Sequence, residues 1–422
     1  MALPELIEVV PLAGPVRAQI TVPGSKSITN RALVLAALST GETTLEGALW
    51  SEDTQVMVAA MRELGFAVNV APDPQEPCNR NLTVHGQGGV VPRAGTGQQP
   101  LALFTGNAGT AARFLAALAC LGRGVYRLHG VPRMHERPQA ALFSALRELG
   151  YRVESPNDRL PALIHGGGAR PAKCRVSIAE SSQFASALLL CADAGKWQVE
   201  VSGENAEESP YVAMTHKLAA AFPRNGGRFQ IEPDASSASY FWGAGLLVPE
   251  SAVAVRAWPA TDWQVDAAFP RFLPLPASVS RRGELGDSIM TAVVLAPFAR
   301  QAVRFTDLGR LRVQECERVL ALRTELTRCG AKVAEEGNTL TVFPSRLHGA
   351  EVETCNDHRM AMCFAILGLK VPGIRLKNPS CVKKTFPNFF QKLAALPPNG
   401  LGAKILEANG GRALSHAELF AE

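Results

Sequence analysis

Residues 23–31, PGSKSITNR, set a lysine between two serines directly before an apolar pattern with helical spacing. A serine at a helix start caps free N–H groups, and a helix start attracts anions, to which Lys26 would add charge. The stretch is not a nucleotide P-loop, because that motif needs a glycine directly before the lysine, where Ser25 stands. Taken alone, it predicts either an anion site or an ordinary capped helix with a solvated lysine.

The same order of polar cap, apolar helix, turn and short strand recurs along the chain. The six copies begin SKSITNRALVLAAL, GNAGTAARFLAAL, SSQFASALLLCA, ASSASYFWGAGLL, GDSIMTAVVLAPF and NDHRMAMCFAILG. A second helix follows most copies, with polar residues on one face and a C-cap glycine such as Gly65, Gly150 or Gly330. The sequence therefore predicts six βαβα-type units with further strands, the third and fourth being shortened.

The first helix of each unit is apolar nearly all round, so we expect it to be buried within one of two cores. Basic residues lie at helix starts or strand ends: Lys26, Arg31, Arg113, Arg133, Arg137, Arg310, Arg312, Arg318, Arg359, Lys383 and Lys384. If the buried helices run parallel, their starts form two clusters, which across a cleft would suit a ligand with several negative charges. Each cap could instead merely satisfy free N–H groups.

Composition excludes several classes of protein. A chain of 422 residues is too long for one core, and 47% hydrophobic with 19% charged residues is typical of a globular protein. A net charge of +5 without a basic run gives no indication of a nucleic-acid partner. We expect no signal peptide, no membrane span and no metal site, and the nine cysteines without a CxxC pair favour reduced thiols in the cytoplasm.

Seven motifs, in order, carry a resemblance that covers about residues 8–395: PGSKSITNR, GNAGTAAR, PRMHERP, SSQF, EPDASSASYF, TCNDHRMAM and KKTFPNFF. The chain resembles the 5-enolpyruvylshikimate-3-phosphate (EPSP) synthase family. That family transfers the enolpyruvyl group of phosphoenolpyruvate to the 5-hydroxyl of shikimate 3-phosphate and releases phosphate, towards chorismate and the aromatic amino acids. The resemblance implies these two substrates, no metal or organic cofactor, and a monomer.

The resemblance also implies an α/β fold with two lobes, each built from three βαβαββ-type units, and an active site in the inter-lobe cleft. The N-terminal lobe would span residues 22–231, and the C-terminal lobe residues 1–21 plus 232–395. Residues 396–422 would form a C-terminal extension beyond the usual end of the family.

By resemblance, each substrate has its own set of binding residues. For shikimate 3-phosphate they are Lys26, Ser27, Arg31, Ser181, Ser182, Gln183, Tyr211, Asp287 and Gln314. For phosphoenolpyruvate they are Lys26, Gly109, Arg137, Gln183, Arg318, Arg359 and Lys384. Supporting positions are Asp53, Asn107 and Thr110.

The resemblance assigns the proton transfers to Asp287, near the 5-hydroxyl, and Glu315, near the methylene carbon, with Lys26 and Lys384 stabilising charge. Which carboxylate acts first as base stays open. Without the resemblance, Glu315 could simply pair with Arg318 on a helix, and Asp287 could be a plain N-cap.

Two departures from the family pattern stand out. Gln314 replaces a lysine that usually contacts the sugar-like substrate, so a charge is lost. Phe114 stands where many members have proline, and we hypothesise that it weakens binding of glyphosate, an inhibitor that competes with phosphoenolpyruvate.

Two other functions remain in view. An enolpyruvyl transferase acting on UDP-N-acetylglucosamine typically has a Lys-Asn pair in the first cap and a loop cysteine, whereas Ser27 follows Lys26 here and the second cap loop has no cysteine. A non-catalytic shikimate-phosphate-binding relic would account for Gln314 and the shortened units, but both carboxylates and the arginine set are retained.

Overall fold

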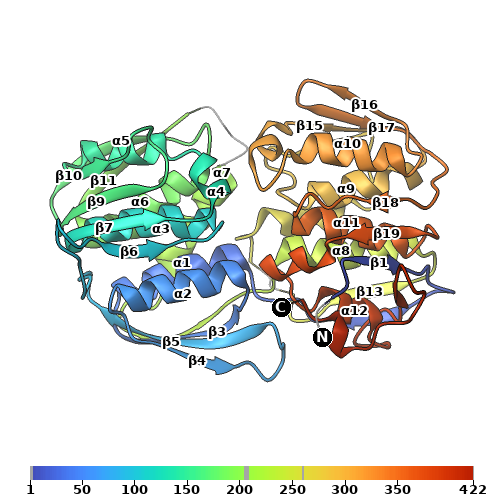
Figure 1. The fold of residues 1–422 in the computed structure, drawn as a ribbon, viewed down its shortest axis with the longest axis horizontal. Coiled ribbons are helices and arrows are strands. Elements are labelled where there is room, and N and C mark those ends of the chain that lie inside the picture. Colours follow the sequence, from blue (N-terminus) through green and yellow to red (C-terminus); the bar gives the residue numbers. More distant parts are fainter. Residues whose placement is uncertain (1–2, 204–208, 259–260, 422) are drawn as a thin grey trace. The chain divides into compact units, whose positions relative to one another are not determined.

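The computed structural model describes residues 3–203, 209–258 and 261–421 (Figure 1). The chain divides into two compact units. One, the N-terminal unit, is Gly24–Glu232, and the other, the C-terminal unit, combines Met1–Pro23 with Pro233–Glu422.

Within the described residues there are six sheets, and four of them share one strand arrangement. In each of the four, the first strand runs parallel to the second, which pairs antiparallel with the third, and the third pairs antiparallel with the fourth. Two of the four lie in the N-terminal unit: β12 (Gly227–Gln230), β3 (Thr40–Leu49), β5 (Asn79–Gln87) and β4 (Val68–Pro72); and β6 (Leu101–Phe104), β7 (Arg123–His129), β9 (Ala162–Gly167) and β8 (Arg152–Glu154). Two lie in the C-terminal unit: β14 (Ser278–Ser280), β15 (Val303–Thr306), β17 (Thr339–Val342) and β16 (Val333–Glu336); and β18 (Glu351–Val352), β19 (Ile374–Lys377), β1 (Leu6–Val9) and β20 (Ile405–Glu407).

The remaining two sheets of the described chain are short parallel pairs. In the N-terminal unit β10 (Ala172–Ser177) pairs with β11 (Trp197–Ser202), and in the C-terminal unit β13 (Ala252–Val255) pairs with β2 (Arg17–Ile20). These pairs belong to the third and fourth copies of the repeated pattern, the two that the sequence predicts to be shortened.

The two ends of the chain join the same sheet of the C-terminal unit. Strand β1 pairs with β19 on one side and with β20 on the other. Its side chains alternate between half-buried and buried, as expected for a strand with one face on a core. Leu401, Ala403 and Ile405 belong to that core, so the segment around β20 packs as an integral part of the unit.

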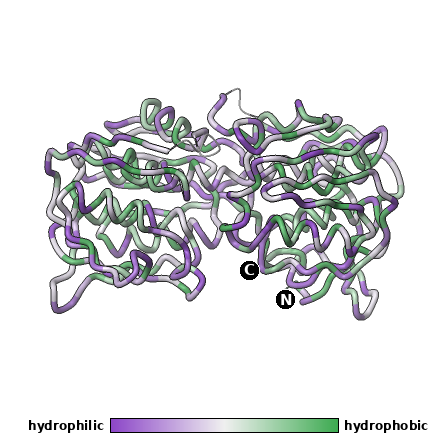
Figure 2. The backbone as a smooth tube through the Cα atoms, turned by 90° about the horizontal axis from the view of Figure 1, so that it is seen from above, coloured by the Kyte–Doolittle hydropathy of each residue, from purple (hydrophilic) through white to green (hydrophobic). Residues whose placement is uncertain are grey.

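Six helices form the interiors of the two units: α1 (Lys26–Leu38), α3 (Gly109–Cys120), α6 (Ser182–Gly195), α8 (Ala235–Leu247), α9 (Ile289–Leu295) and α11 (His358–Gly368). Every residue of α3 and α9 is buried, which confirms the prediction for these two helices. Helices α1, α3 and α6 pack together, as do α8, α9 and α11. Figure 2 shows hydrophobic stretches in the interior of both units.

More exposed helices follow the core strands: α2 (Glu52–Glu63), α4 (Pro132–Glu136), α5 (Ala140–Glu148), α7 (Ser209–Ala221), α10 (Arg318–Arg328) and α12 (Phe389–Ala394). Gly65, Gly150 and Gly330 follow three of them with φ of +91°, +86° and +93°. Glycine adopts this left-handed conformation without a steric cost, so the predicted C-caps are confirmed.

Several loops contain 3₁₀ helices: η2 (Val265–Phe272), η3 (Ala296–Phe298), η4 (Gly309–Val313), η5 (Pro379–Lys384) and η6 (Ala417–Leu419). In the part of the chain that the structure describes, no helix combines the length and apolar character needed to cross a membrane.

Candidate active site

In the N-terminal unit, the stretch PGSKSITNR (residues 23–31) contains the start of helix α1. Ser25 is the N-cap, but its side chain makes no capping hydrogen bond. Lys26 forms an ion pair with Asp53, in the first turn of α2, over 3.0 Å between Nζ and Oδ2. The side chains of Lys26 and Asp53 are 18% and 7% exposed, so the ammonium is held in place while keeping a face towards solvent. Ser27 follows, and its carbonyl accepts a hydrogen bond from Arg31.

Arg31 joins three helices of this unit. Its Nε donates to Thr215 Oγ1 over 2.8 Å and its Nη2 donates to Ser186 Oγ over 2.9 Å. The carbonyl of Tyr211, one turn before Thr215, accepts from the same threonine hydroxyl. The guanidinium also lies 5.4 Å from the centroid of the Phe114 ring. Burial lowers the pKa of Arg31 to about 10. The structure therefore gives Arg31 a role in holding helices together, and its contact with a phosphate stays a prediction.

The starts of α3 and α6 meet through Gln183. Its Oε1 accepts from Arg113 Nη1 over 2.8 Å, and its Nε2 donates to Thr110 Oγ1 over 3.2 Å. Ser181 is the N-cap of α6 and accepts from the Gln183 N–H, while Ser182 is the first residue of the helix. The predicted residues of the second and third copies thus lie together.

Gly109 leaves room for two arginines. A Cβ at this position would collide with the guanidinium groups of Arg113 and Arg137. Arg137 is buried and donates from Nη1 to the carbonyl of Asn107 over 3.0 Å. The absence of a side chain at Gly109 lets both cations approach the helix start, where an anion is favoured.

In the C-terminal unit, Asp287 is surrounded by three arginines. Its carboxylate lies 3.1 Å from Arg359, 3.4 Å from Arg281 and 3.6 Å from Arg318. Burial alone would raise the pKa of Asp287, but the three cations hold that pKa well below its usual range. Ser288 is the N-cap of α9, so Asp287 is not a plain cap.

Arg318, 1% exposed, lies at the centre of this cluster. It pairs with Asp357 over 2.7 Å. Burial alone would lower the pKa of Arg318, but the neighbouring carboxylates raise that pKa above its usual value. Gln314 bridges the cluster, since its Nε2 donates to Asp287 over 3.4 Å and its Oε1 accepts from Arg318 over 2.5 Å.

Glu315 contacts two cations from different segments. Its carboxylate lies 2.9 Å from Arg318 and 3.4 Å from Lys384, at the end of η5. Helix α10 begins at Arg318, so the pair with Glu315 spans a loop and a helix start rather than a helix face. Glu315 is thus held between a guanidinium group and an ammonium group.

Arg359 completes the set at the start of α11. Asp357 caps this helix and accepts from the Arg359 N–H over 2.8 Å. The Arg359 side chain is 11% exposed, and its Nη1 donates to the Tyr240 hydroxyl over 3.4 Å. Burial raises the pKa of Tyr240 above its usual value, so the phenol stays neutral.

Several residues of these clusters were not among the predicted site residues: Arg113, Tyr240, Asp266, Arg281 and Asp357. Arg113 and Asp357 lie inside motifs that the sequence singled out, GNAGTAAR and TCNDHRMAM, so a signal for them existed. Asp266 and Arg281 lie outside all seven motifs. Arg281 precedes Asp287 by six residues, whereas only the folded chain brings Asp266 to the neighbours of Asp287.

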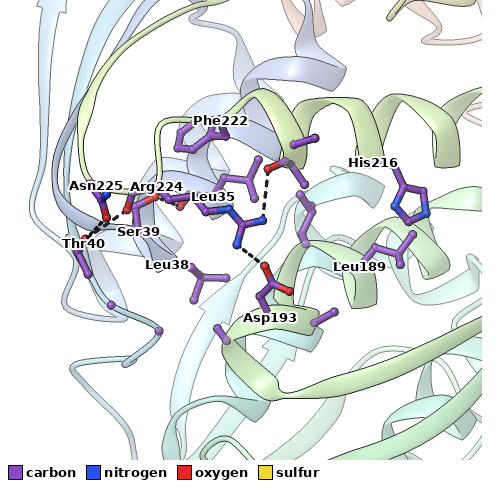
Figure 3. Close-up of a pocket in the computed structure, with 17 residues that line it drawn as sticks. Leu35, Leu38, Ser39, Thr40, Leu189, Asp193, His216, Phe222, Arg224 and Asn225 are labelled. Carbon is purple, nitrogen blue, oxygen red and sulfur yellow. Dashed lines mark hydrogen bonds and ion pairs between the residues drawn. The ribbon is translucent and has the colours of Figure 1, made fainter.

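A cavity of about 600 Å³ lies elsewhere in the N-terminal unit (Figure 3). It is lined by the last turns of α1, α6 and α7, including Leu35, Leu38 and Leu189, and Arg224 pairs with Asp193 at its edge. Lys26 and Gln183 begin two of these helices, so the cavity is at their opposite ends and is distinct from the predicted site.

Comparison with known proteins gives a family. Residues 12–223 and 283–393 match the family model described as EPSP synthase (3-phosphoshikimate 1-carboxyvinyltransferase). A 3-phosphoshikimate 1-carboxyvinyltransferase of Opitutus terrae is 38% identical over 441 residues, covering 95% of this chain and all of that protein. One from Pseudomonas syringae is 38% identical over 423 residues, covering 92% of this chain and 97% of the relative.

Two solved structures share the fold. An EPSP synthase from Acinetobacter baumannii aligns with a TM-score of 0.75 at 20% identity, over 96% of this chain and 100% of that one. The enolpyruvyl transferase NikO from Streptomyces tendae aligns with a TM-score of 0.67 at 16% identity, over 98% and 99% of the two chains. The chain has a mixed α/β enolpyruvyl-transferase fold and belongs to the EPSP synthase family.

Proposed function

We propose that the chain transfers the enolpyruvyl group of phosphoenolpyruvate to the 5-hydroxyl of shikimate 3-phosphate and releases phosphate. The observation that carries the proposal is the cluster in which Arg318 joins two carboxylates, Asp287 and Glu315, in a chain that matches the family over both units. The reaction requires two proton transfers, and carboxylates at fixed positions can supply them.

We place the reaction in a cleft between two lobes, each with three βαβαββ-type units. Four sheets of one strand arrangement and two shortened parallel pairs support a sixfold origin. Both substrates carry a phosphate and a carboxylate, so the site must neutralise several negative charges. We assign phosphoenolpyruvate to Lys26, Gly109, Arg137, Gln183, Arg318, Arg359 and Lys384. We assign shikimate 3-phosphate to Lys26, Ser27, Arg31, Ser181, Ser182, Gln183, Tyr211, Asp287 and Gln314, with Asp53, Asn107 and Thr110 as supports.

In the proposed mechanism, the 5-oxygen attacks C2 of phosphoenolpyruvate and loses its proton, while C3 gains one. The tetrahedral intermediate then loses phosphate from C2 and a proton from the new methyl group. Asp287 would accept the hydroxyl proton. Its low pKa makes it a weak base in the unliganded protein, but substrate anions that engage Arg318 and Arg359 would relieve this effect and raise its basicity.

Glu315 and Lys384 would act on phosphoenolpyruvate, the other partner in the new bond. Glu315, in its protonated form, would donate a proton to C3 in the addition step and, as the carboxylate, would accept one from the methyl group in the elimination step. The ammonium 3.4 Å away would stabilise the departing phosphate. Lys26, which Asp53 holds in place, would add a positive charge from the N-terminal unit.

The proposal is tested by phosphate release from the purified protein with phosphoenolpyruvate, with and without shikimate 3-phosphate. Release should require both substrates and fall by roughly 10²–10⁴ in Glu315→Gln, the range typical of a lost general acid or base. Glu336→Gln, an exposed carboxylate of β16, is the matched control and should retain activity.

The same assay separates the two alternatives. Binding of shikimate 3-phosphate without phosphate release would favour a relic, in which Gln314 has replaced the lysine that usually contacts the sugar-like substrate. Release with UDP-N-acetylglucosamine but not with shikimate 3-phosphate would favour the related transferase.

We further propose that the enzyme acts in the cytoplasm as a monomer. All nine cysteines are free thiols, which is typical of a reducing compartment. The monomer rests on the family resemblance, and light scattering on the purified protein would test it.

A further inference from the structure

Asp266 is a buried carboxylate that contacts the residues on either side of Asp287. It lies in η2, is 5% exposed, and its Oδ1 accepts from the Gly286 N–H over 2.8 Å and from the Ser288 N–H over 3.0 Å. The Ser288 hydroxyl donates to the same oxygen over 2.5 Å. Its other oxygen, Oδ2, accepts from the Ser236 hydroxyl over 2.5 Å. One carboxylate thus receives four hydrogen bonds, three of them from the segment that carries Asp287.

These hydrogen bonds anchor the segment that leads into α9. A helix start leaves backbone N–H groups without partners, and a side chain usually accepts from them. Ser288, the N-cap of α9, makes no side-chain cap hydrogen bond of its own. Asp266 instead accepts from the N–H of Ser288 and from that of Gly286, two residues earlier, although it lies about 20 residues away along the chain. The backbone that enters α9 is therefore held by a carboxylate from a distant part of the chain.

These hydrogen bonds restrict the backbone of Asp287. Because the N–H groups before and after it are both bound to one oxygen, a rotation of the Asp287 backbone would break at least one of these hydrogen bonds. Hydrogen bonds to a charged acceptor are stronger than neutral ones, so this restraint is a firm one. In this backbone conformation the Asp287 carboxylate lies 3.1 Å from Arg359 and 3.6 Å from Arg318.

We propose that Asp266 is a positioning residue for the enolpyruvyl transfer: it holds residues 286–288 so that Asp287 stays oriented towards the arginines and the reacting hydroxyl. The inference rests on the proposed function of Asp287. In this proposal Asp266 does not contact a substrate and acts only through Asp287.

The competing explanation is that Asp266 merely stabilises the unit. A double-mutant cycle separates the two, because residues that act through one another give non-additive effects. Asp266→Ala should lower kcat about 10²-fold, the scale expected for a misplacement of roughly 1 Å, and should change KM much less. Asp266→Asn, which keeps one acceptor oxygen, should recover most of the loss.

In an Asp287→Ala background, Asp266→Ala should lower the residual kcat by no more than about threefold, because the group that it positions is already gone. An equal loss in both backgrounds overturns the proposal. Gln264→Ala is the matched control, since this buried side chain holds Ala235 and Pro233 at the start of a different helix. A fall in kcat as large as that of Asp266→Ala would also overturn it.

A second readout does not depend on turnover. Hydrogen exchange of the peptide spanning residues 284–290 should be faster in Asp266→Ala than in the wild type and unchanged in Gln264→Ala. If the wild-type protein released no phosphate, the proposed function would fail, whereas unchanged exchange in Asp266→Ala would overturn the positioning itself.

Discussion

The Arg318 guanidinium makes a bidentate pair with Asp357, from Nε to Oδ2 over 2.7 Å and from Nη2 to Oδ1 over 3.2 Å. Both side chains are almost fully buried, at 1% and 0% exposure. Planar forked donors suit such a pair, and the pair fixes the guanidinium before any substrate arrives.

Removing the charge of Arg318 should therefore cost both stability and activity. Arg318→Met leaves the buried Asp357 carboxylate without its arginine partner, and we expect the free energy of unfolding to fall by about 3–5 kcal/mol. Urea denaturation checks this value. Arg318→Lys keeps the positive charge but loses the forked guanidinium donors. Its free energy of unfolding should therefore be higher than that of Arg318→Met, while its rate of phosphate release should still be at least about tenfold below that of the wild type. Wild-type turnover in Arg318→Lys would contradict this explanation.

Asp287 should make the stability of the protein depend on pH in the acid range. Its folded pKa lies below the ordinary value of 3.8, so the folded state favours the carboxylate. The resulting stabilisation is present above that ordinary value and is lost as the pH falls through the folded pKa. Asp287→Asn should thus be less stable than the wild type at neutral pH, and the difference should shrink below about pH 4. Urea unfolding from pH 3 to pH 7 measures it, and a difference that grows towards acid pH would contradict the sign.

Cys355 should react with iodoacetamide at lower pH than an ordinary thiol. The neighbouring Cys316 side chain lowers the pKa of Cys355 from 9.0, although burial acts in the opposite direction. In Cys316→Ala the midpoint of alkylation should move up towards 9.0. Burial raises the pKa of Cys191, so this thiol is the internal control and should stay unmodified in the folded protein. Peptide mass spectrometry reads both sites.

Phe114 should affect the response to glyphosate. The ring is fully buried in α3 and lies beneath the guanidinium of Arg31, five residues after Gly109 begins the helix. Phe114→Leu places a smaller side chain here. The inhibition constant of glyphosate, measured in competition with phosphoenolpyruvate, should therefore fall several-fold. An inhibition constant in the wild type as low as that of sensitive family members would contradict the idea. Leu118→Met, which exchanges another buried residue of α3 for one of similar volume, is the control.

The sequence by itself determined the local features of the protein. Apolar spacing at helical period marked buried helices such as α3, and Gly65, Gly150 and Gly330 marked where surface helices end. These signals could be recognised because each depends on residues a few positions apart. The motifs likewise carried the family, and with it most residues that the structure gathers around Asp287 and Gln183.

Only the tertiary structure decided which distant residues meet. The antiparallel pairing of β1 with β19 and β20, and the hydrogen bonds of Asp266 to the segment around Asp287, join parts of the chain that no local pattern relates. The same holds for Arg31, whose donors are directed to Thr215 and Ser186. Strand partners and buried hydrogen bonds are selected by the packing of the whole unit, because a buried polar group takes whichever partner the fold brings within reach.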